Sequence, residues 1–132
     1  MKNLSIVSIL AVFVFAACFT FIQVKPWSVP DVAKTKKNAV VADAQVIATG
    51  KGLWDIHCKS CHGAKGQGDG TKAAQLKTEP GDFTKADVQA QTDGAFFFKI
   101  SEGRDDMPSF KKKIADEDDR WSLVHYMRKF KK

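Results

Sequence analysis

The chain has 132 residues, of which 44% are hydrophobic and 27% are charged, and its formal net charge at pH 7 is +6. This length suits one modest domain with a tether, and the composition excludes a mostly disordered or mostly membrane-embedded protein. Three cysteines are too few for a disulfide scaffold.

The first 24 residues are predicted to be a targeting or anchoring segment. Residues 4–24 form an uncharged run of 21 residues, long enough to cross a bilayer as a helix. A signal anchor is the first interpretation. A lipoprotein signal is the second, because Phe15-Ala16-Ala17-Cys18 resembles a lipidation motif and Cys18 would then carry the lipid. The third is a signal cleaved near Ala17. The first two would hold the domain at a membrane on its exported face.

Residues 25–42 are predicted to be a semi-flexible linker, because they contain two prolines and show no sustained periodicity. This segment holds four lysines and one aspartate, a net charge of +3. Residues 43–132 hold 16 basic and 14 acidic residues, a net charge of only +2. The positive charge therefore belongs mostly to the linker, and a nucleic-acid partner is not expected.

Residues 43–132 are predicted to form an all-α domain with long loops. Apolar residues three and four apart predict a helix from Val46 to His57. The following stretch, 63–83, is rich in glycine and turn formers and is predicted to be mainly loop. A short helix is expected over 94–101. The acidic run 116–119 predicts the start of a last helix, with Arg128, Lys129 and Lys131 toward its C-terminus. No strand pattern is evident.

The segment Cys58-Lys59-Ser60-Cys61-His62 carries the first chemical signal. This spacing is typical of c-type haem attachment, in which both thiols form thioethers with the haem and the adjacent imidazole binds its iron. A structural zinc site requires four ligands, and no second Cys or His pair is present. A thioredoxin-like motif requires a βαβ context, which is also missing. A Cys58–Cys61 disulfide would leave His62 unexplained.

Met107 is the best candidate for a second axial ligand. It lies in the turn-like stretch 103–110, which Pro108 stiffens, and it follows His62 by 45 residues. Met127, His57 and His125 are rivals, but each is better explained as a packing or surface residue.

Further motifs follow in an order that gives the chain a family resemblance. They are Gly66-Gln67-Gly68-Asp69-Gly70, Pro80-Gly81-Asp82-Phe83, the stretch Gly103 to Phe110, and a last helix with Trp121 and Tyr126. From about residue 50 to 130 the chain resembles a class I cytochrome c of the small bacterial monohaem type. Many relatives carry proline after the Gly-Asp-Gly, where this chain has Thr71.

The resemblance implies a cytochrome c fold and one covalently attached haem c. Cys58 and Cys61 would be the thioether partners, and His62 and Met107 the axial ligands. The resemblance also implies that Gly50 lets the first helix pass close to the last helix near Tyr126, which a missing Cβ permits. A dry aromatic shell around the haem is expected from Trp54, Phe83, Phe96, Phe97, Phe98, Phe110 and Trp121.

The expected function is electron transfer, with no catalytic residues and no small-molecule substrate. The resemblance implies a haem domain on the exported side of a bacterial cell envelope with redox proteins as partners, and the apolar run at 4–24 predicts that it is tethered to the membrane. It would serve a respiratory chain as a carrier, or as a subunit of a quinol-oxidising or terminal oxidase complex. The alternatives are a haem protein in which Met107 dissociates to admit a small ligand or substrate, and a binding module without haem.

Overall fold

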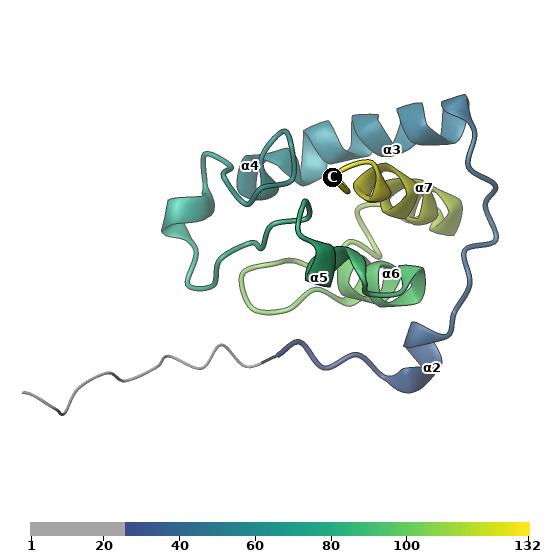
Figure 1. Cartoon of the computed structure of the whole chain (residues 1–132), viewed down its shortest axis with the longest axis horizontal. Coiled ribbons are helices and arrows are strands. Elements are labelled where there is room, and N and C mark those ends of the chain that lie inside the picture. The colour runs from purple at the N-terminus through teal and green to yellow at the C-terminus, as the bar shows by residue number, and fades with distance from the viewer. Residues whose placement is uncertain (1–25) are drawn as a thin grey trace, which may run out of the picture.

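The structure is a computed structural model that describes residues 26–132 (Figure 1). In chain order its helical elements are α2 (Asp31–Lys34), α3 (Ala44–His57), α4 (Lys59–His62), the 3-10 turn η2 (Ala73–Gln75), α5 (Ala86–Gln89), α6 (Asp93–Glu102) and α7 (Glu117–Arg128). Between residues 26 and 132 the only β-type pairing is an isolated bridge from Arg104 to Met107. The all-α prediction is confirmed.

The predicted leader at 1–24, including Cys18, lies outside the described residues. Residues 26–132 include no helix with the length and apolar character needed to cross a membrane.

Each of the three long helices begins at a residue whose side chain accepts a backbone hydrogen bond. Asp43 accepts from Val46 N at 2.8 Å before α3, and Thr92 accepts from Ala95 N at 3.2 Å before α6. Asp116 accepts from Asp118 N at 2.9 Å before α7. Such caps satisfy amide groups that have no partner within the helix. The sequence predicted all three helices to within a few residues of these bounds.

Helices α3 and α7 cross in contact, and Gly50 lies at the crossing. A Cβ atom at Gly50 would lie 2.7 Å from the carbonyl carbon of Ser122 and 2.9 Å from Cβ of Tyr126. Only glycine allows this approach, so the predicted role of Gly50 is confirmed. Helix α6 packs against α7, and the buried apolar side chains of α3, α6, α7 and the stretch after Phe110 form one core.

Residues 26–42, predicted to be a linker, contact this core domain along much of their length. Helix α2 packs on α6, and Val29 just before it is buried. Figure 1 shows the chain continuing from α2 past α6 and α7 to reach α3. Helices α2 and α5 were not predicted, because four residues are too few to show a helical period.

Candidate functional site

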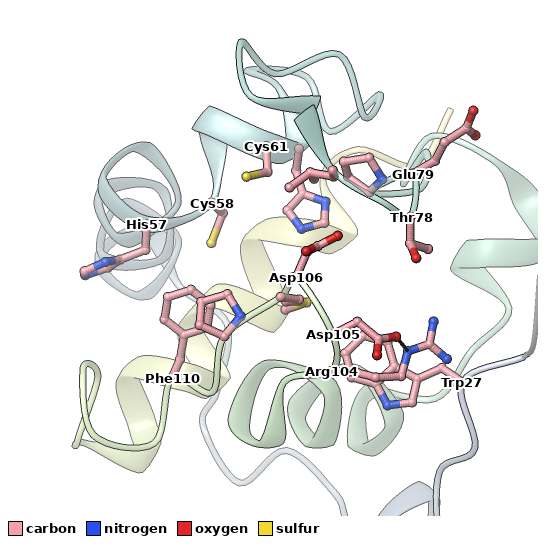
Figure 2. Close-up of a pocket in the computed structure, with 15 residues that line it drawn as sticks. Trp27, His57, Cys58, Cys61, Thr78, Glu79, Arg104, Asp105, Asp106 and Phe110 are labelled. Atoms are coloured by element: carbon pink, nitrogen blue, oxygen red, sulfur yellow. Dashed lines mark ion pairs between the residues drawn. The ribbon is translucent and has the colours of Figure 1, made fainter. Parts of the chain in front are cut away.

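The main candidate site is a cleft between the α3–α4 junction, the loop around residues 76–80, and the stretch 104–110 (Figure 2). Its lining is Trp27, His57, Cys58, Cys61, His62, Leu76, Thr78, Glu79, Pro80, Arg104, Asp105, Asp106, Met107, Pro108 and Phe110. Figure 2 shows His57 and Phe110 at one end of the cleft, and Trp27 with Arg104 and Asp105 at the other. All four predicted site residues, Cys58, Cys61, His62 and Met107, lie in this lining.

One helical turn brings the two thiols and the imidazole to the same cleft. The amides of Cys61 and His62 both donate to the carbonyl of Cys58, at 3.1 Å and 2.9 Å. Both cysteines are free thiols and not a disulfide. Burial raises the pKa of Cys58 to about 12, and the neighbouring Cys61 acts in the same direction. The Cys58 thiol is therefore protonated near neutral pH.

The imidazole of His62 is packed between aromatic rings. Its centroid lies 5.7 Å from that of Trp54 and 5.1 Å from that of Phe83. Trp54 also donates from Nε1 to the carbonyl of Gly63 at 3.0 Å, which ties the end of α4 to α3. The Trp54 and Phe83 rings thus restrict the orientation of the His62 ring.

Burial lowers the pKa of His62 to about 4, so the ring is neutral at pH 7. The backbone of Pro80 acts in the opposite direction on this pKa. Even so, the buried Nδ1 atom has no partner at full hydrogen-bonding geometry among the described residues. A neutral imidazole has a lone pair available for a metal, as an axial ligand requires.

Met107 is held by a tight turn. Its carbonyl accepts from Arg104 N at 2.8 Å, and its amide donates to the Arg104 carbonyl at 2.9 Å. Gly103, with φ of 69°, precedes the turn, and a Cβ there would lie 2.5 Å from the carbonyl oxygen of Met107. At the tip, Asp105 has a φ of 50°, in the left-handed region that aspartate tolerates better than most residues. The hydrogen bonds and close packing of this turn therefore restrain the backbone that carries the Met107 thioether.

Two of the three rival ligands, Met127 and His125, are not among the residues that line the cleft. Met127 is buried in the core with 4% exposure. His125 interacts through Nε2 with the carbonyl of Val40 at 2.8 Å, on the surface of α7. His57 does line the cleft, and its ring lies 5.8 Å from that of Phe110. Met127 is thus a packing residue, as the sequence predicts, and His125 lies against residues of the 26–42 segment.

The predicted aromatic shell divides into three groups. Phe110 lines the cleft directly, while Trp54 and Phe83 contact His62. Phe96 stands one ring further back, 5.9 Å from Phe83. The others lie elsewhere, with Phe97 stacked on Trp121 at 4.0 Å in the core and Phe98 half-buried beside a neighbouring groove.

Several cleft residues were not predicted from the sequence. Pro80 and Arg104 belong to motifs that carry the family resemblance. The sequence therefore marked these two segments, but it did not predict that Pro80 and Arg104 themselves line the cleft. Trp27 lies in the predicted linker, and no local pattern marks it as a site residue.

The donor set fits a covalently attached haem. Two free thiols can form thioethers, and a neutral imidazole and a thioether can ligate its iron from groups that share one cleft. Residues 26–132 hold no cluster of three or more His, Cys, Asp or Glu side chains that would suit a bare metal ion.

Comparison with known proteins agrees with this geometry. Residues 45–127 match the family model described as cytochrome C oxidase, cbb3-type, subunit III. The chain belongs to this cytochrome family. The match spans the three long helices and the whole α3–α4 junction, and membership implies one covalently bound haem c. The comparison with curated proteins gave no match.

Two solved structures resemble this cytochrome. One is in the reducing HAO-like protein complex Kustc0457/Kustc0458 of Kuenenia stuttgartiensis, with 25% identity and a TM-score of 0.65 over 74% of this chain. The alignment covers only 50% of that protein's chain. The other is the KustC0563 c-type cytochrome, with 34% identity and a TM-score of 0.54. It aligns over 63% of this chain and 98% of its own.

Proposed function

We propose that this cytochrome transfers electrons through one haem c attached to Cys58 and Cys61, with His62 and Met107 as its axial ligands. The observation that carries the proposal is that these four side chains, from two segments 45 residues apart, line one cleft. Bound haem supplies a one-electron redox couple, and methionine ligation raises its reduction potential.

The residues of the chain prepare the cleft for this role. Burial keeps the His62 imidazole neutral, and the turn from Arg104 to Met107 holds the thioether in place. His62 and Met107 would both hold the iron, which would leave no coordination position for a substrate. The aromatic rings around His62 exclude water, and such a shell tunes the reduction potential. This arrangement suits electron transfer better than catalysis.

The proposal extends to the cellular setting. We place the haem domain on the exported face of a bacterial membrane, held there by residues 1–24, and in a respiratory chain. The uncharged run 4–24 supports the tether. The family description names an oxidase subunit, and one structural neighbour is part of a multi-protein complex. Both support a role beside larger redox partners.

The ligand assignment is tested on full-length protein made with haem-maturation machinery. Intact mass should show one covalent haem, and the reduced protein a c-type α band. Met107→Ala should lose the ferric methionine-to-iron charge-transfer band while keeping the haem. Met127→Leu, a volume-conserving change in the core, should retain the band. An unchanged charge-transfer band in Met107→Ala would exclude Met107 as the ligand. Carbon monoxide binding to the reduced wild type at neutral pH would instead favour a haem protein that binds small ligands.

The cellular setting has its own tests. Mass spectrometry of the mature N-terminus separates an intact anchor, a lipidated Cys18 and cleavage near Ala17. Isolation in gentle detergent should recover a redox complex together with this cytochrome. Recovery of the cytochrome in the soluble fraction would contradict the tether.

A further inference from the structure

Residues 26–42, here called the strap, lie before the family match at 45–127 and yet are docked on the domain. Val29 is 8% exposed. The backbone of α2 and the residues after it approaches α6 so closely that a Cβ on Gly94 would lie 2.6 Å from the carbonyl oxygen of Lys36. Only a glycine at position 94 allows this contact, so α6 is shaped to receive the strap.

The second half of the strap is attached to α7. Lys36 forms an ion pair with Glu117 at 2.6 Å, and its ammonium lies 4.5 Å from the ring centroid of Phe97. The Nε2 atom of His125 lies 2.9 Å from Nδ2 of Asn38 and 2.8 Å from the carbonyl oxygen of Val40. The strap is thus joined to the domain at points spread over more than ten residues.

At the start of the strap, Trp27 lines the haem cleft. Its ring lies 4.7 Å from the guanidinium carbon of Arg104 and 5.4 Å from Nζ of Lys99. Arg104 is also the residue whose backbone forms the turn that holds Met107. Trp27 therefore contacts the base of the methionine turn and forms a wall at one end of the cleft, as Figure 2 shows.

We propose that the strap is a working part of the haem site, in which Trp27 closes one end of the cleft and steadies the methionine turn. A flat aromatic side chain at this end limits the access of water and small molecules to the haem, and stacking on Arg104 resists opening of the turn. This inference rests on the proposed function, because it needs haem in the cleft. The family match does not include the strap, so the proposal concerns a feature of this chain.

The first test compares Trp27→Ala with Trp27→Phe in the full-length haem protein. Imidazole is added to the ferric protein, and the rate at which it replaces the methionine ligand is followed by loss of the charge-transfer band. Because the cation–π contact is lost, imidazole should replace the methionine ligand about two- to fivefold faster in Trp27→Ala than in wild type. Trp27→Phe, which keeps an aromatic ring, should stay close to wild type. Val32→Ala, at a strap residue that is 81% exposed, is the control and should not change the rate.

The second test displaces the strap without touching the cleft. Gly94→Ala should push α2 away from α6 and so speed imidazole binding as Trp27→Ala does. Gly52→Ala is its matched control, because a Cβ there meets nothing within 4 Å. Hydrogen exchange should show residues 28–40 protected in the wild type and less protected in Gly94→Ala.

Two results would overturn the proposal. One is an unchanged imidazole rate in both Trp27→Ala and Gly94→Ala, and the other is wild-type exchange across 28–40 as fast as in a free peptide. Failure of the proposed function would look different, because the wild-type protein itself would then lack covalent haem mass or the methionine band.

Discussion

Met107 owes its position to neighbours on both sides of the turn. Inside the turn, its backbone exchanges two hydrogen bonds with Arg104. Outside it, Asp106 accepts a hydrogen bond from the backbone amide of Lys77 at 2.7 Å, which links the turn to the loop across the cleft. The thioether is thus held by one local and one long-range restraint.

Substitution of Asp106 by alanine should loosen this long-range restraint. The lost hydrogen bond is worth about 0.5–1.5 kcal/mol, and its exposed position favours the lower end of that range. Met107 should then be displaced more readily, and added imidazole should replace it faster in the ferric variant than in the ferric wild type, as followed by loss of the methionine-to-iron charge-transfer band. Asp106→Asn keeps a side-chain oxygen acceptor and should stay near wild type. Equal rates for alanine and wild type would show that the link to Lys77 does not restrain the turn.

At the residue scale, the sequence predicted those site residues whose signal is local. Cys58, Cys61 and His62 are adjacent or one turn apart, so their spacing alone indicates a shared cofactor. Met107 was found because a proline and a turn surround it. Trp27 was missed, because its partners Lys99 and Arg104 are more than 70 positions away and no spacing rule joins them.

Elements show the same division between local and long-range signals. Helices α3, α6 and α7 have caps, apolar periods and charge patterns that are visible in the sequence. The docking of α2 on α6 depends on close contact between a four-residue helix and Gly94, 60 positions later. Neither the short helix nor the glycine indicates this contact when its local sequence is considered alone. The cytochrome fold was therefore predictable, whereas the docking of the strap was not.

The crossing of α3 and α7 gives a matched pair of glycine substitutions. Gly50→Ala would place a methyl group against the backbone of Ser122, and overpacking of this kind costs about 1–3 kcal/mol. Gly52→Ala adds the same methyl group to the same helix in open space, and should stabilise the protein by up to about 1 kcal/mol through helix propensity. Thermal or denaturant unfolding should show opposite signs. Destabilisation by both substitutions would mean that the crossing is not the cause.

The attachment of the strap to α7 should depend on pH through Glu117. The hydrogen bond and charge of Lys36 hold the pKa of Glu117 below its usual value of 4.5. A lowered pKa means that the pair stabilises the folded state above about pH 4.5, and that this contribution is lost as the pH falls through the lower folded-state pKa. Because both side chains are about half exposed, the contribution is at most about 1 kcal/mol.

Glu117→Gln, which keeps the size of the side chain but cannot ionise, provides the comparison. At pH 7 the variant should be slightly less stable than wild type and should show faster hydrogen exchange in residues 34–40. The difference should shrink as the pH is lowered toward 3. A difference that persists at pH 3 would assign it to packing and not to charge.

For the whole molecule, docking of the strap bears on how much of the net charge of +6 is available to a partner. Two of the strap lysines are already paired, Lys34 with Asp31 at 2.8 Å and Lys36 with Glu117 at 2.6 Å. The docked strap also means that the haem cleft does not swing on a linker of 18 residues. Its distance from the end of the apolar run is set by the few residues that precede Trp27.

This geometry predicts a haem held close to the membrane surface. Two residues lie between Val24 and Trp27, so three residue steps join them, and an extended chain spans at most about 3.3–3.6 Å per residue. With the proposed anchor at 4–24, the cleft edge would lie within roughly 11 Å of the end of that anchor. In vesicles, the haem of the full-length protein should strongly quench a fluorophore attached to lipid headgroups. Insertion of about 15 Gly and Ser residues between Lys25 and Pro26 adds a coil of roughly 20 Å and should relieve much of that quenching. The inserted variant should keep the same imidazole rate, because its strap is intact. Equal quenching with and without the insertion would contradict a fixed cleft, since only a freely swinging domain would be insensitive to the added length.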